Sequence, residues 1–316
     1  MKYYAGLDLG GTFVKGGIVD EEGNILVKDK IPTGKERPYE EIAKDMAELA
    51  AELAKRANVP AGALAAAGIG SPGLIDSGKG IVVYNNNLGW KKAALAAEVK
   101  KYLGVPVYVT NDANAAALGE HFCGSGRKYS SLILVTLGTG VGGAVIADGK
   151  LIAGAHGAGG ELGHMVINRD EPEACACGRH GCVQQYASAT GIVRVAKQYL
   201  DAHPDAASAM RGVDKLTAKA VFDCAAAGDA AAKAALETVY DAFGFFLAAG
   251  CTVSDPEAVV IGGGVSRAGA PLLEGVRQGF LKYAFYPNRD VRFALASLGN
   301  DAGIYGCCKL ILDRFG

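Results

Sequence analysis

The sequence predicts a two-domain α/β protein. At 316 residues the chain exceeds the roughly 250–300 residues at which a single hydrophobic core stops growing. A pattern of strand, glycine turn, strand, hairpin turn and strand occurs twice, at residues 3–30 and 131–156. Helix and strand patterns follow each copy. Because the same unit opens both halves, we expect two domains of similar core, each beginning with an antiparallel β-meander.

The elements between the two copies alternate in type. A helix is predicted over residues 39–57, whose apolar side chains recur on one helical face: Ile42, Met46, Leu49 and Leu53. We expect a strand at 64–69, a helix at 91–103 and a strand at 105–109. These patterns indicate a sheet covered by helices in the first domain.

The second half is richer in helix. Residues 188–251 are predicted to be mostly helical, and a strand follows at 258–261. A helix at 270–283, a strand at 291–295 and a terminal helix at 301–314 complete the chain.

A cysteine-rich loop predicts a metal site. Cys175, Cys177 and Cys182 form a C-x-C-x4-C array, and His164 lies a short loop upstream. Three thiolates and one imidazole complete a tetrahedral set for Zn²⁺, and a closed set of this kind is structural. The alternative is a group of buried or disulfide-bonded cysteines. The remaining cysteines are expected to be small core residues: Cys123, Cys224, Cys251, Cys307 and Cys308.

The same loop offers polar side chains for a ligand, because Glu161 lies one helical turn before His164. Glycine turns between strands offer a second kind of site, since exposed N–H groups can wrap a phosphate chain. Gly138, Gly140 and Gly143 match the spacing of the dinucleotide fingerprint. That fingerprint requires a helix directly after the glycines, whereas a hairpin pattern follows here, so we reject the Rossmann interpretation.

Composition excludes several function classes. The hydrophobic fraction of 50% predicts a well-packed globular protein, and the net charge of −1 provides no basic field for nucleic acid or an anionic membrane. The first residues enter a strand pattern, so no signal segment is expected, and no later run is expected to approach the ~20 apolar residues of a membrane span. A thiolate metal site suits a reducing compartment, so a cytoplasmic location is expected.

Seven motifs together resemble the ROK family of bacterial sugar kinases, most closely its glucokinase-like members. They are DLGGTFVKGG at the start, GIGSPGLID at 68–76, NDANAAALGE at 111–120, LGTGVGGAVI at 137–146, GGELGH at 159–164, CACGRHGC at 175–182 and IGGGVS at 261–266. The resemblance covers essentially the whole chain, and the order of the motifs makes it specific.

The resemblance implies the actin-like, hexokinase-type ATPase fold. Two actin-like (ribonuclease H-like) domains, each a mixed β-sheet with helices, are then expected to face each other across a cleft. We expect a small domain over residues 1–111, completed by the helix at 301–316. A large domain over 112–300 is expected to carry the zinc loop at 159–184. The implied reaction is ATP-dependent phosphorylation of a hexose, expected to be glucose, at its 6-hydroxyl.

The family's roles carry over to individual positions. Asp112 would be the general base, although its place at a predicted helix start also suits an N-cap. Expected sugar contacts are Asn87 (or Asn85 or Asn86), Asn111, Asp112, Glu161, His164 and Gln184. His164 would use one nitrogen for zinc and the other for the sugar.

The resemblance also implies the nucleotide-binding residues. Asp8 would hold Mg²⁺ through water, and Gly10, Gly11 and Thr12 would form the first phosphate loop. Lys15 is either part of this site or a solvated strand lysine. The remaining expected contacts to ATP are Gly138, Thr139 and Gly140 on the phosphates and Gly263 and Gly264 beside the adenine.

One position departs from the family pattern. The cysteine motif usually continues C-x-E, and that Glu contacts the sugar, whereas this chain has Gln184. An amide loses the charge-assisted bond to a hydroxyl, so other hexoses remain open: N-acetylmannosamine, N-acetylglucosamine, fructose and allose.

Two other function classes are alternatives to a sugar kinase. A sugar-responsive repressor would need a DNA-docking element that this sequence does not show, and a non-catalytic sugar-binding protein is the third class. The family is commonly dimeric, so the resemblance also implies a homodimer.

Overall fold

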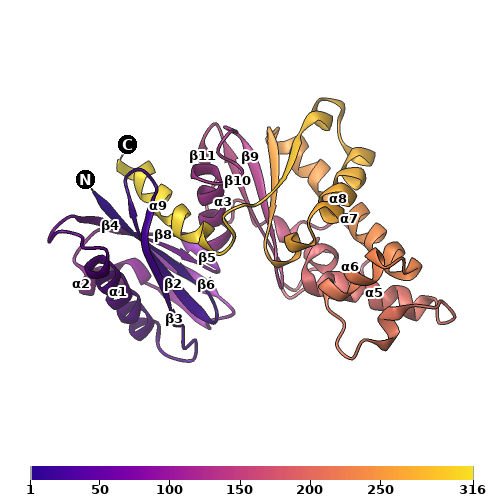
Figure 1. The fold of residues 1–316 in the computed structure, drawn as a ribbon, viewed down its shortest axis with the longest axis horizontal. Helices are drawn as coiled ribbons and strands as arrows, with labels where there is room; N and C mark the ends of the chain where they lie inside the picture. The colour runs from indigo at the N-terminus through magenta and orange to yellow at the C-terminus, as the bar shows by residue number, and fades with distance from the viewer. Residues whose placement is uncertain (1, 316) are drawn as a thin grey trace. The chain divides into compact units, whose positions relative to one another are not determined.

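The computed structural model of the protein describes residues 2–315, which cluster into two compact units (Figure 1). Unit 1 contains residues up to Tyr129, Lys150–Gly160 and the residues from Ser297 onward. Unit 2 contains Ser130–Gly149 and Glu161–Ala296. The structure contains two five-stranded mixed β-sheets with helices; one lies in unit 1, and four strands of the other lie in unit 2.

The sheet of unit 1 has the strand order β3-β2-β1-β4-β8. Its strands are β1 (Tyr3–Leu9), β2 (Phe13–Asp20), β3 (Ile25–Pro32), β4 (Leu64–Ser71) and β8 (Val107–Asn111). The first three strands are antiparallel, as the predicted meander requires, whereas β4 and β8 run parallel to β1. The carboxyl ends of β1, β4 and β8 therefore share one edge of the sheet.

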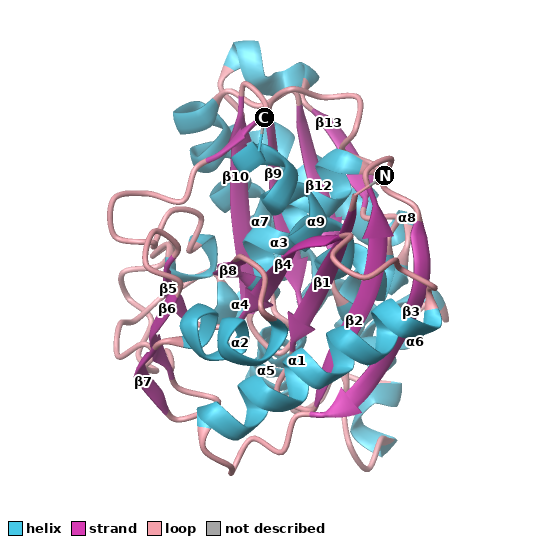
Figure 2. Cartoon of the chain, turned by 90° about the vertical axis from the view of Figure 1, so that its left-hand side faces the viewer, coloured by secondary structure: helices cyan, strands magenta, loops and turns pink. Residues whose placement is uncertain are grey.

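Helices cover both faces of this sheet. Helix α1 (Tyr39–Arg56) crosses one face (Figure 2), where Leu49 and Leu53 pack against Gly16 of β2. Helix α9 (Ala302–Phe315) covers the other face and packs against α3 (Asp112–Phe122). This contact needs glycine, because a Cβ on Gly306 would lie 1.6 Å from the Ala115 carbonyl oxygen.

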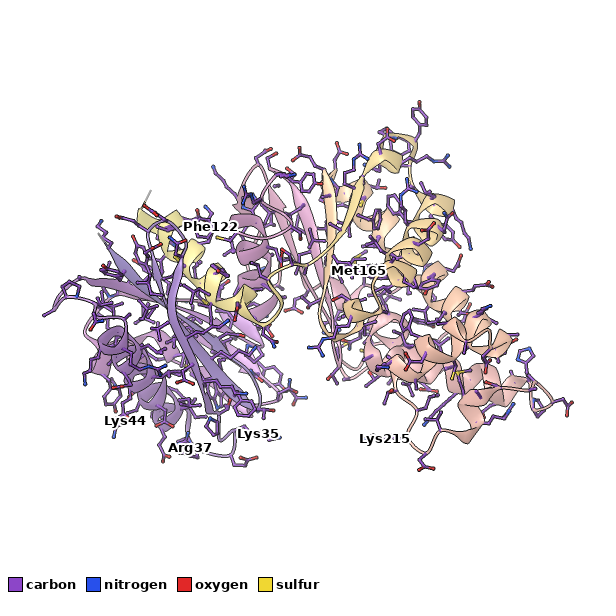
Figure 3. All side chains as sticks on the ribbon, viewed as in Figure 1. Lys35, Arg37, Lys44, Phe122, Met165 and Lys215 are labelled. Carbon is purple, nitrogen blue, oxygen red and sulfur yellow. The ribbon has the colours of Figure 1, made fainter. Side chains whose placement is uncertain are left out.

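Helix α3 therefore belongs to unit 1, whereas the second domain was predicted to begin at residue 112. Its packing against α9 is the physical reason. Phe122, at the end of α3, packs on the apolar cluster that α9 forms with the sheet (Figure 3).

A second, three-stranded sheet in unit 1 was not predicted. It comprises β5 (Leu74–Asp76), β6 (Ile81–Asn85) and β7 (Trp90–Ala93) in that order. The predicted helix at 91–103 is wrong in its first part, because the residues of β7 pair with β6 and bury Trp90 and Ala93. Only the remainder forms a helix, α2 (Leu95–Leu103).

The second five-stranded sheet has the strand order β11-β10-β9-β12-β13, in which all strands except β11 belong to unit 2. Its strands are β9 (Leu132–Leu137), β10 (Val141–Ala147), β11 (Lys150–Leu151), β12 (Ala258–Gly262) and β13 (Arg292–Leu295). The second meander is predicted correctly in its first two strands. Its third strand is reduced to the two residues of β11, because a glycine-rich loop replaces the rest.

The helices of unit 2 bury their apolar faces in one core. They are α4 (Gln184–Ala187), α5 (Ala189–Ala202), α6 (Ala218–Ala226), α7 (Ala230–Ser254) and α8 (Ala270–Tyr283). Met165, labelled in Figure 3, packs at the edge of this core. Short 3-10 helices complete the chain: η1 (Leu162–His164), η2 (Ala209–Gly212), η3 (Gly264–Ala268), η4 (Tyr286–Asp290) and η5 (Gly299–Asp301).

Of the helices within residues 2–315, α7 alone is long and apolar enough to span a membrane by length and composition. The expectation that no run approaches this length is therefore wrong for α7. Half of its apolar window is buried, and α7 packs against α5, α6 and α8 in unit 2. These contacts are those of a core helix.

Candidate functional site

The unit 1 part of the site begins with an ion pair on adjacent strands. Asp8 on β1 lies directly opposite Lys15 on β2, and the Lys15 ammonium nitrogen is 3.1 Å from Asp8 Oδ2. The two side chains are 34% (Lys15) and 19% (Asp8) exposed. Lys15 is therefore held beside Asp8 and is not the solvated strand lysine that the sequence left open.

The first glycine turn, residues 10–12, is fixed from its inner side. Buried Thr33 donates its hydroxyl to the Gly10 carbonyl at 2.7 Å and its N–H to the Thr12 carbonyl at 2.9 Å. Gly10 also donates its N–H to the Phe13 carbonyl at 3.0 Å. Gly11 and Thr12 remain exposed at the end of β1. The turn is thus a rigid backbone loop that faces solvent.

Asn111 and Asp112 lie where β8 passes into α3. The Asn111 side chain is the N-cap, since its Oδ1 accepts the N–H groups of Ala113 at 2.8 Å and Asn114 at 3.3 Å. The cap role that the sequence left open for Asp112 therefore belongs to its neighbour. Asp112 is the first residue of α3, and its carboxylate is exposed near the positive end of the helix dipole.

The turn at residues 71–73 lies within the GIGSPGLID motif, and its carbonyl groups accept bonds from two asparagines. Asn111 Nδ2 donates to the Gly73 carbonyl at 3.1 Å, and Asn85 Nδ2 donates to the Pro72 carbonyl at 2.6 Å. This turn thus fixes Asn111 next to Asp112. Recognising it requires knowing that β4 and β8 are neighbours, which local sequence does not reveal.

The three asparagines of the NNNLGW segment differ in their surroundings. Asn85 is buried and uses its Oδ1 for the Leu88 N–H, so both ends of its amide are occupied within unit 1. Asn86 accepts a bond from the Tyr84 hydroxyl at 3.2 Å. Asn87 is exposed. Asn85 is therefore a structural residue, whereas Asn86 and Asn87 are both exposed and accessible to a ligand.

In unit 2, two glycine turns lie at the same sheet edge. Strands β9 and β12 are parallel, so residues 138–140 and 262–264 follow neighbouring carboxyl ends. Gly263 has φ of +84°, and a Cβ there would lie 2.5 Å from the Leu137 carbonyl oxygen. The turn at 138–140 closes on itself through Gly138 N–H to Gly140 O at 2.9 Å. Such an edge is the usual ligand-binding position of α/β sheets.

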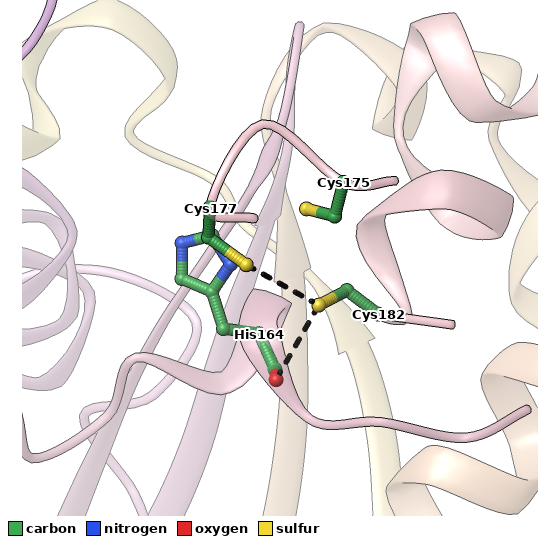
Figure 4. Close-up of side chains that lie close together, drawn as sticks. All are labelled: His164, Cys175, Cys177 and Cys182. Atoms are coloured by element: carbon green, nitrogen blue, oxygen red, sulfur yellow. Dashed lines mark hydrogen bonds between the residues drawn. The ribbon is translucent and has the colours of Figure 1, made fainter. Parts of the chain in front are cut away.

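The metal ligands predicted from sequence converge within unit 2. One ligand atom from each of His164, Cys175, Cys177 and Cys182 lies within 4.8 Å of the others (Figure 4). A Zn–S bond of ≈ 2.3 Å gives sulfur–sulfur separations of about 3.8 Å in a tetrahedron. The Cys177 and Cys182 sulfurs are 3.6 Å apart, which fits that geometry.

Two further observations show that this set suits a metal. His164 Nδ1 is buried without a hydrogen-bond partner among the described residues, as expected for a nitrogen that binds a cation. Although desolvation opposes ionisation, hydrogen bonds from Arg179 lower the pKa of Cys177 to about 6. Desolvation and the neighbouring thiols raise the pKa of Cys182 to about 12. Metal binding therefore has to displace protons from this site.

The cysteine loop is braced by bonds that the sequence did not predict. Buried Glu171 accepts the Tyr186 hydroxyl at 2.6 Å and the Arg194 guanidinium. Main-chain bonds tie the strands of the loop together, including Ile167 N–H to Gly181 O at 2.8 Å. Gly181 has φ of +74°, and a Cβ there would lie 1.6 Å from the Asn168 carbonyl oxygen. Only glycine fits this position.

The two remaining predicted sugar contacts also lie in unit 2. Glu161 directly precedes η1; its side chain is accessible, yet desolvation by neighbouring protein atoms raises the pKa of its carboxyl. Gln184 begins α4, and its Nε2 donates to Cys175 Sγ at 2.9 Å. The structure thus joins Gln184 to the metal ligands. The predicted sites divide between the units, with residues 8–15, 87, 111 and 112 in unit 1 and the others in unit 2.

Exposed carboxylates and rigid glycine turns at strand ends, together with a thiolate-rich metal loop, are features of a phosphotransferase that binds a polar substrate. The chain matches the ROK family over residues 4–314 and belongs to that family. It is 38% identical over 309 residues to the glucokinase of Halalkalibacterium halodurans, with 96% of this chain and 93% of that protein aligned.

A solved structure supports the same family. A ROK family glucokinase from Streptomyces griseus, in complex with glucose and AMPPNP, has a TM-score of 0.79 and 34% identity, with 98% of each chain covered. The family also includes regulators similar to this chain. The xylose repressor of Caldicellulosiruptor bescii is 29% identical over 98% of this chain and 77% of that protein. The resemblance found from the motifs, including the actin-like ATPase fold, is confirmed.

Proposed function

We propose that this protein is a glucokinase that transfers the γ-phosphoryl group of ATP to the 6-hydroxyl of glucose. The observation that carries the proposal is the exposed Asp112 carboxylate at the first position of α3, directly after the N-cap Asn111. A group that accepts a substrate proton must be accessible and positioned, and this one is both. The similarity to glucokinases over nearly the full chain supports the same activity.

Asp112 acts as the general base in this proposal. Its carboxylate accepts the proton of the sugar hydroxyl as that oxygen bonds to the γ-phosphorus, and ADP leaves with the electrons of the broken P–O bond. Phosphoryl transfer depends mainly on positioning and charge stabilisation. Asn111 has one Nδ2 hydrogen left for a sugar hydroxyl, because its other polar groups hold the α3 N-terminus and the 71–73 turn.

The residues proposed to bind the substrates come from both units. We propose that the glycine turns at 10–12 and 138–140 hold the ATP phosphates, while Gly263 and Gly264 lie beside the adenine. Asn87, Glu161 and His164 bind sugar hydroxyls together with Asn111. Mg²⁺, when bound, neutralises charge on the phosphates. Asp8 offers it an oxygen ligand at the edge that carries the first turn, and Lys15 adds a positive charge there.

The zinc is structural in this proposal. Four protein ligands close its coordination, so no position remains for a reacting water. With the buried Nδ1 of His164 on the metal, Nε2 is left to donate to the sugar from a fixed ring orientation. We further propose a cytoplasmic location, consistent with eight free cysteines among the described residues, and a homodimer.

The proposal is tested by a steady-state screen of hexoses with ATP, coupled to ADP release. The panel is glucose, N-acetylmannosamine, N-acetylglucosamine, fructose and allose. Glucose should give the highest kcat/KM. A higher value for another hexose would reassign the substrate, and no ADP release with any sugar would leave a non-catalytic regulator as the better interpretation.

A further inference from the structure

Gln184 lies between the metal ligands and a glycine turn of unit 2. Its Nε2 donates to Cys175 Sγ at 2.9 Å, and Cys175 is 5% exposed. A carboxylate at this position, the usual residue of the family, has no hydrogen to donate to a thiolate. The amide therefore makes a contact that its ionised counterpart cannot make.

The other end of the same amide lies against the turn at residues 138–140. A Cβ added to Gly140 would lie 3.0 Å from Gln184 Oε1, so the amide occupies the space beside this turn. One side chain of intermediate burial thus contacts a metal ligand at its nitrogen and borders the turn at its oxygen.

The main chain that follows Gln184 strengthens this connection. Ala189 donates its N–H to the Gly138 carbonyl at 2.8 Å, and Thr190 donates its hydroxyl to the Thr139 carbonyl at 2.8 Å. Ser188, between them and α4, caps α5 and donates its hydroxyl to the Gln184 carbonyl at 2.6 Å. Each residue of the turn is therefore in contact with the segment that leaves the cysteine loop.

Charge explains why an amide suits this position. Three thiolates and one Zn²⁺ leave a net charge of −1 on the metal centre. An N–H donor stabilises a thiolate that carries this charge, whereas a carboxylate would place a second negative charge beside it. Hydrogen-bond partners of metal ligands usually change metal affinity by 10–100-fold when they are replaced.

We propose that Gln184 is a positioning residue that couples the metal site to the turn at 138–140, by donating to the Cys175 thiolate and supporting Gly140. It does not act as the sugar contact that the family pattern implies. The effect on ATP rests on the proposed function of that turn, whereas the effect on metal binding does not. Gln184 stands where the family usually has Glu. Its amide can contact both Cys175 and the turn, and it therefore links zinc retention to ATP binding.

The test compares Gln184→Glu and Gln184→Met with Gln198→Glu, which makes the same charge change on the exposed surface of α5. Zinc release from the folded protein into an excess of chelator is followed by absorbance. Cobalt-substituted protein reports the thiolate-to-metal charge-transfer band. KM values for ATP and glucose are then measured with zinc bound.

Both Gln184 variants should release zinc about 10-fold faster or more and shift the cobalt charge-transfer band, with Gln184→Glu the more severe. KM for ATP should rise several-fold while KM for glucose changes less than twofold, and Gln198→Glu should match the wild type. Unchanged zinc release with an altered glucose KM would make Gln184 a sugar contact and overturn the proposal. Faster zinc release in a protein without kinase activity would reject the proposed function but keep the metal role.

Discussion

Glu120 provides the sharpest stability prediction. It is fully buried in α3, and its carboxylate accepts the backbone N–H groups of Ser125, Ser297 and Leu298 at 2.8–3.1 Å. The hydroxyls of the two serines donate to the same carboxylate. These residues lie near two of the four places where the chain passes between the units, Tyr129 to Ser130 and Ala296 to Ser297. Glu120 thus holds the segments at two of these four connections to unit 1.

Replacing Glu120 with Ala removes the acceptor for three backbone donors at once. Each buried donor left without a partner costs about 1–3 kcal/mol, and water entering the new cavity recovers part of that. We therefore expect a loss of about 3–6 kcal/mol, a large share of the 5–15 kcal/mol by which domains are usually stable. Glu120→Gln keeps one oxygen but sets an NH₂ against at least one N–H group. Its expected loss is about 1–3 kcal/mol.

Urea unfolding followed by tryptophan fluorescence measures this effect in the relevant unit. The chain has one tryptophan, Trp90, which is buried in unit 1. Glu52→Ala, on the exposed side of α1, is the matched control and should change the stability by less than about 0.5 kcal/mol. A loss below about 1 kcal/mol for Glu120→Ala would refute the assignment of this carboxylate as the fastening group.

Three other predictions concern the metal, the turn and the units. Elemental analysis should find one zinc per chain in the wild type and none in Cys177→Ser. The variant should also bind glucose more weakly, because the Glu161–His164 segment loses its support. Full activity without zinc would show that the loop is dispensable. Gly140→Ala should raise KM for ATP more than KM for glucose, since its Cβ would lie 3.0 Å from Gln184 Oε1; equal changes in both would contradict the role of this turn. Glucose should lower the radius of gyration in small-angle scattering, because the sugar contacts proposed above come from both units; an unchanged value would argue against closure.

Local sequence was sufficient to predict the elements whose spacing of residues specifies their backbone geometry. The period of two and the glycine turns predicted the meanders, and the spacing of Cys175, Cys177 and Cys182 predicted ligands that the structure brings together with His164. Helix α1 was predicted to within a residue, because its apolar face is regular and continuous.

The elements that sequence missed depend on distant partners. Trp90–Ala93 resembles the start of a helix until β6 pairs with it, and the 71–73 turn gains its role only from asparagines on other segments. Glu120 looks like an ordinary helix residue, yet its bonding partners lie up to 178 residues away. Gln184 was interpreted from the family pattern as a sugar contact, whereas its contact with Cys175 depends on how the loop folds.

The most direct test of the account is product formation by the wild type and Asp112→Asn with ATP and glucose. Phosphorus NMR should show glucose 6-phosphate and ADP accumulating together with the wild type. Removing a general base typically lowers the rate by ~10²–10⁴, so Asp112→Asn should be nearly inactive. It should still fold and bind glucose with similar affinity. A variant that keeps more than about a tenth of the wild-type kcat would contradict the role of Asp112, and a wild type that forms no sugar phosphate would contradict the proposed function.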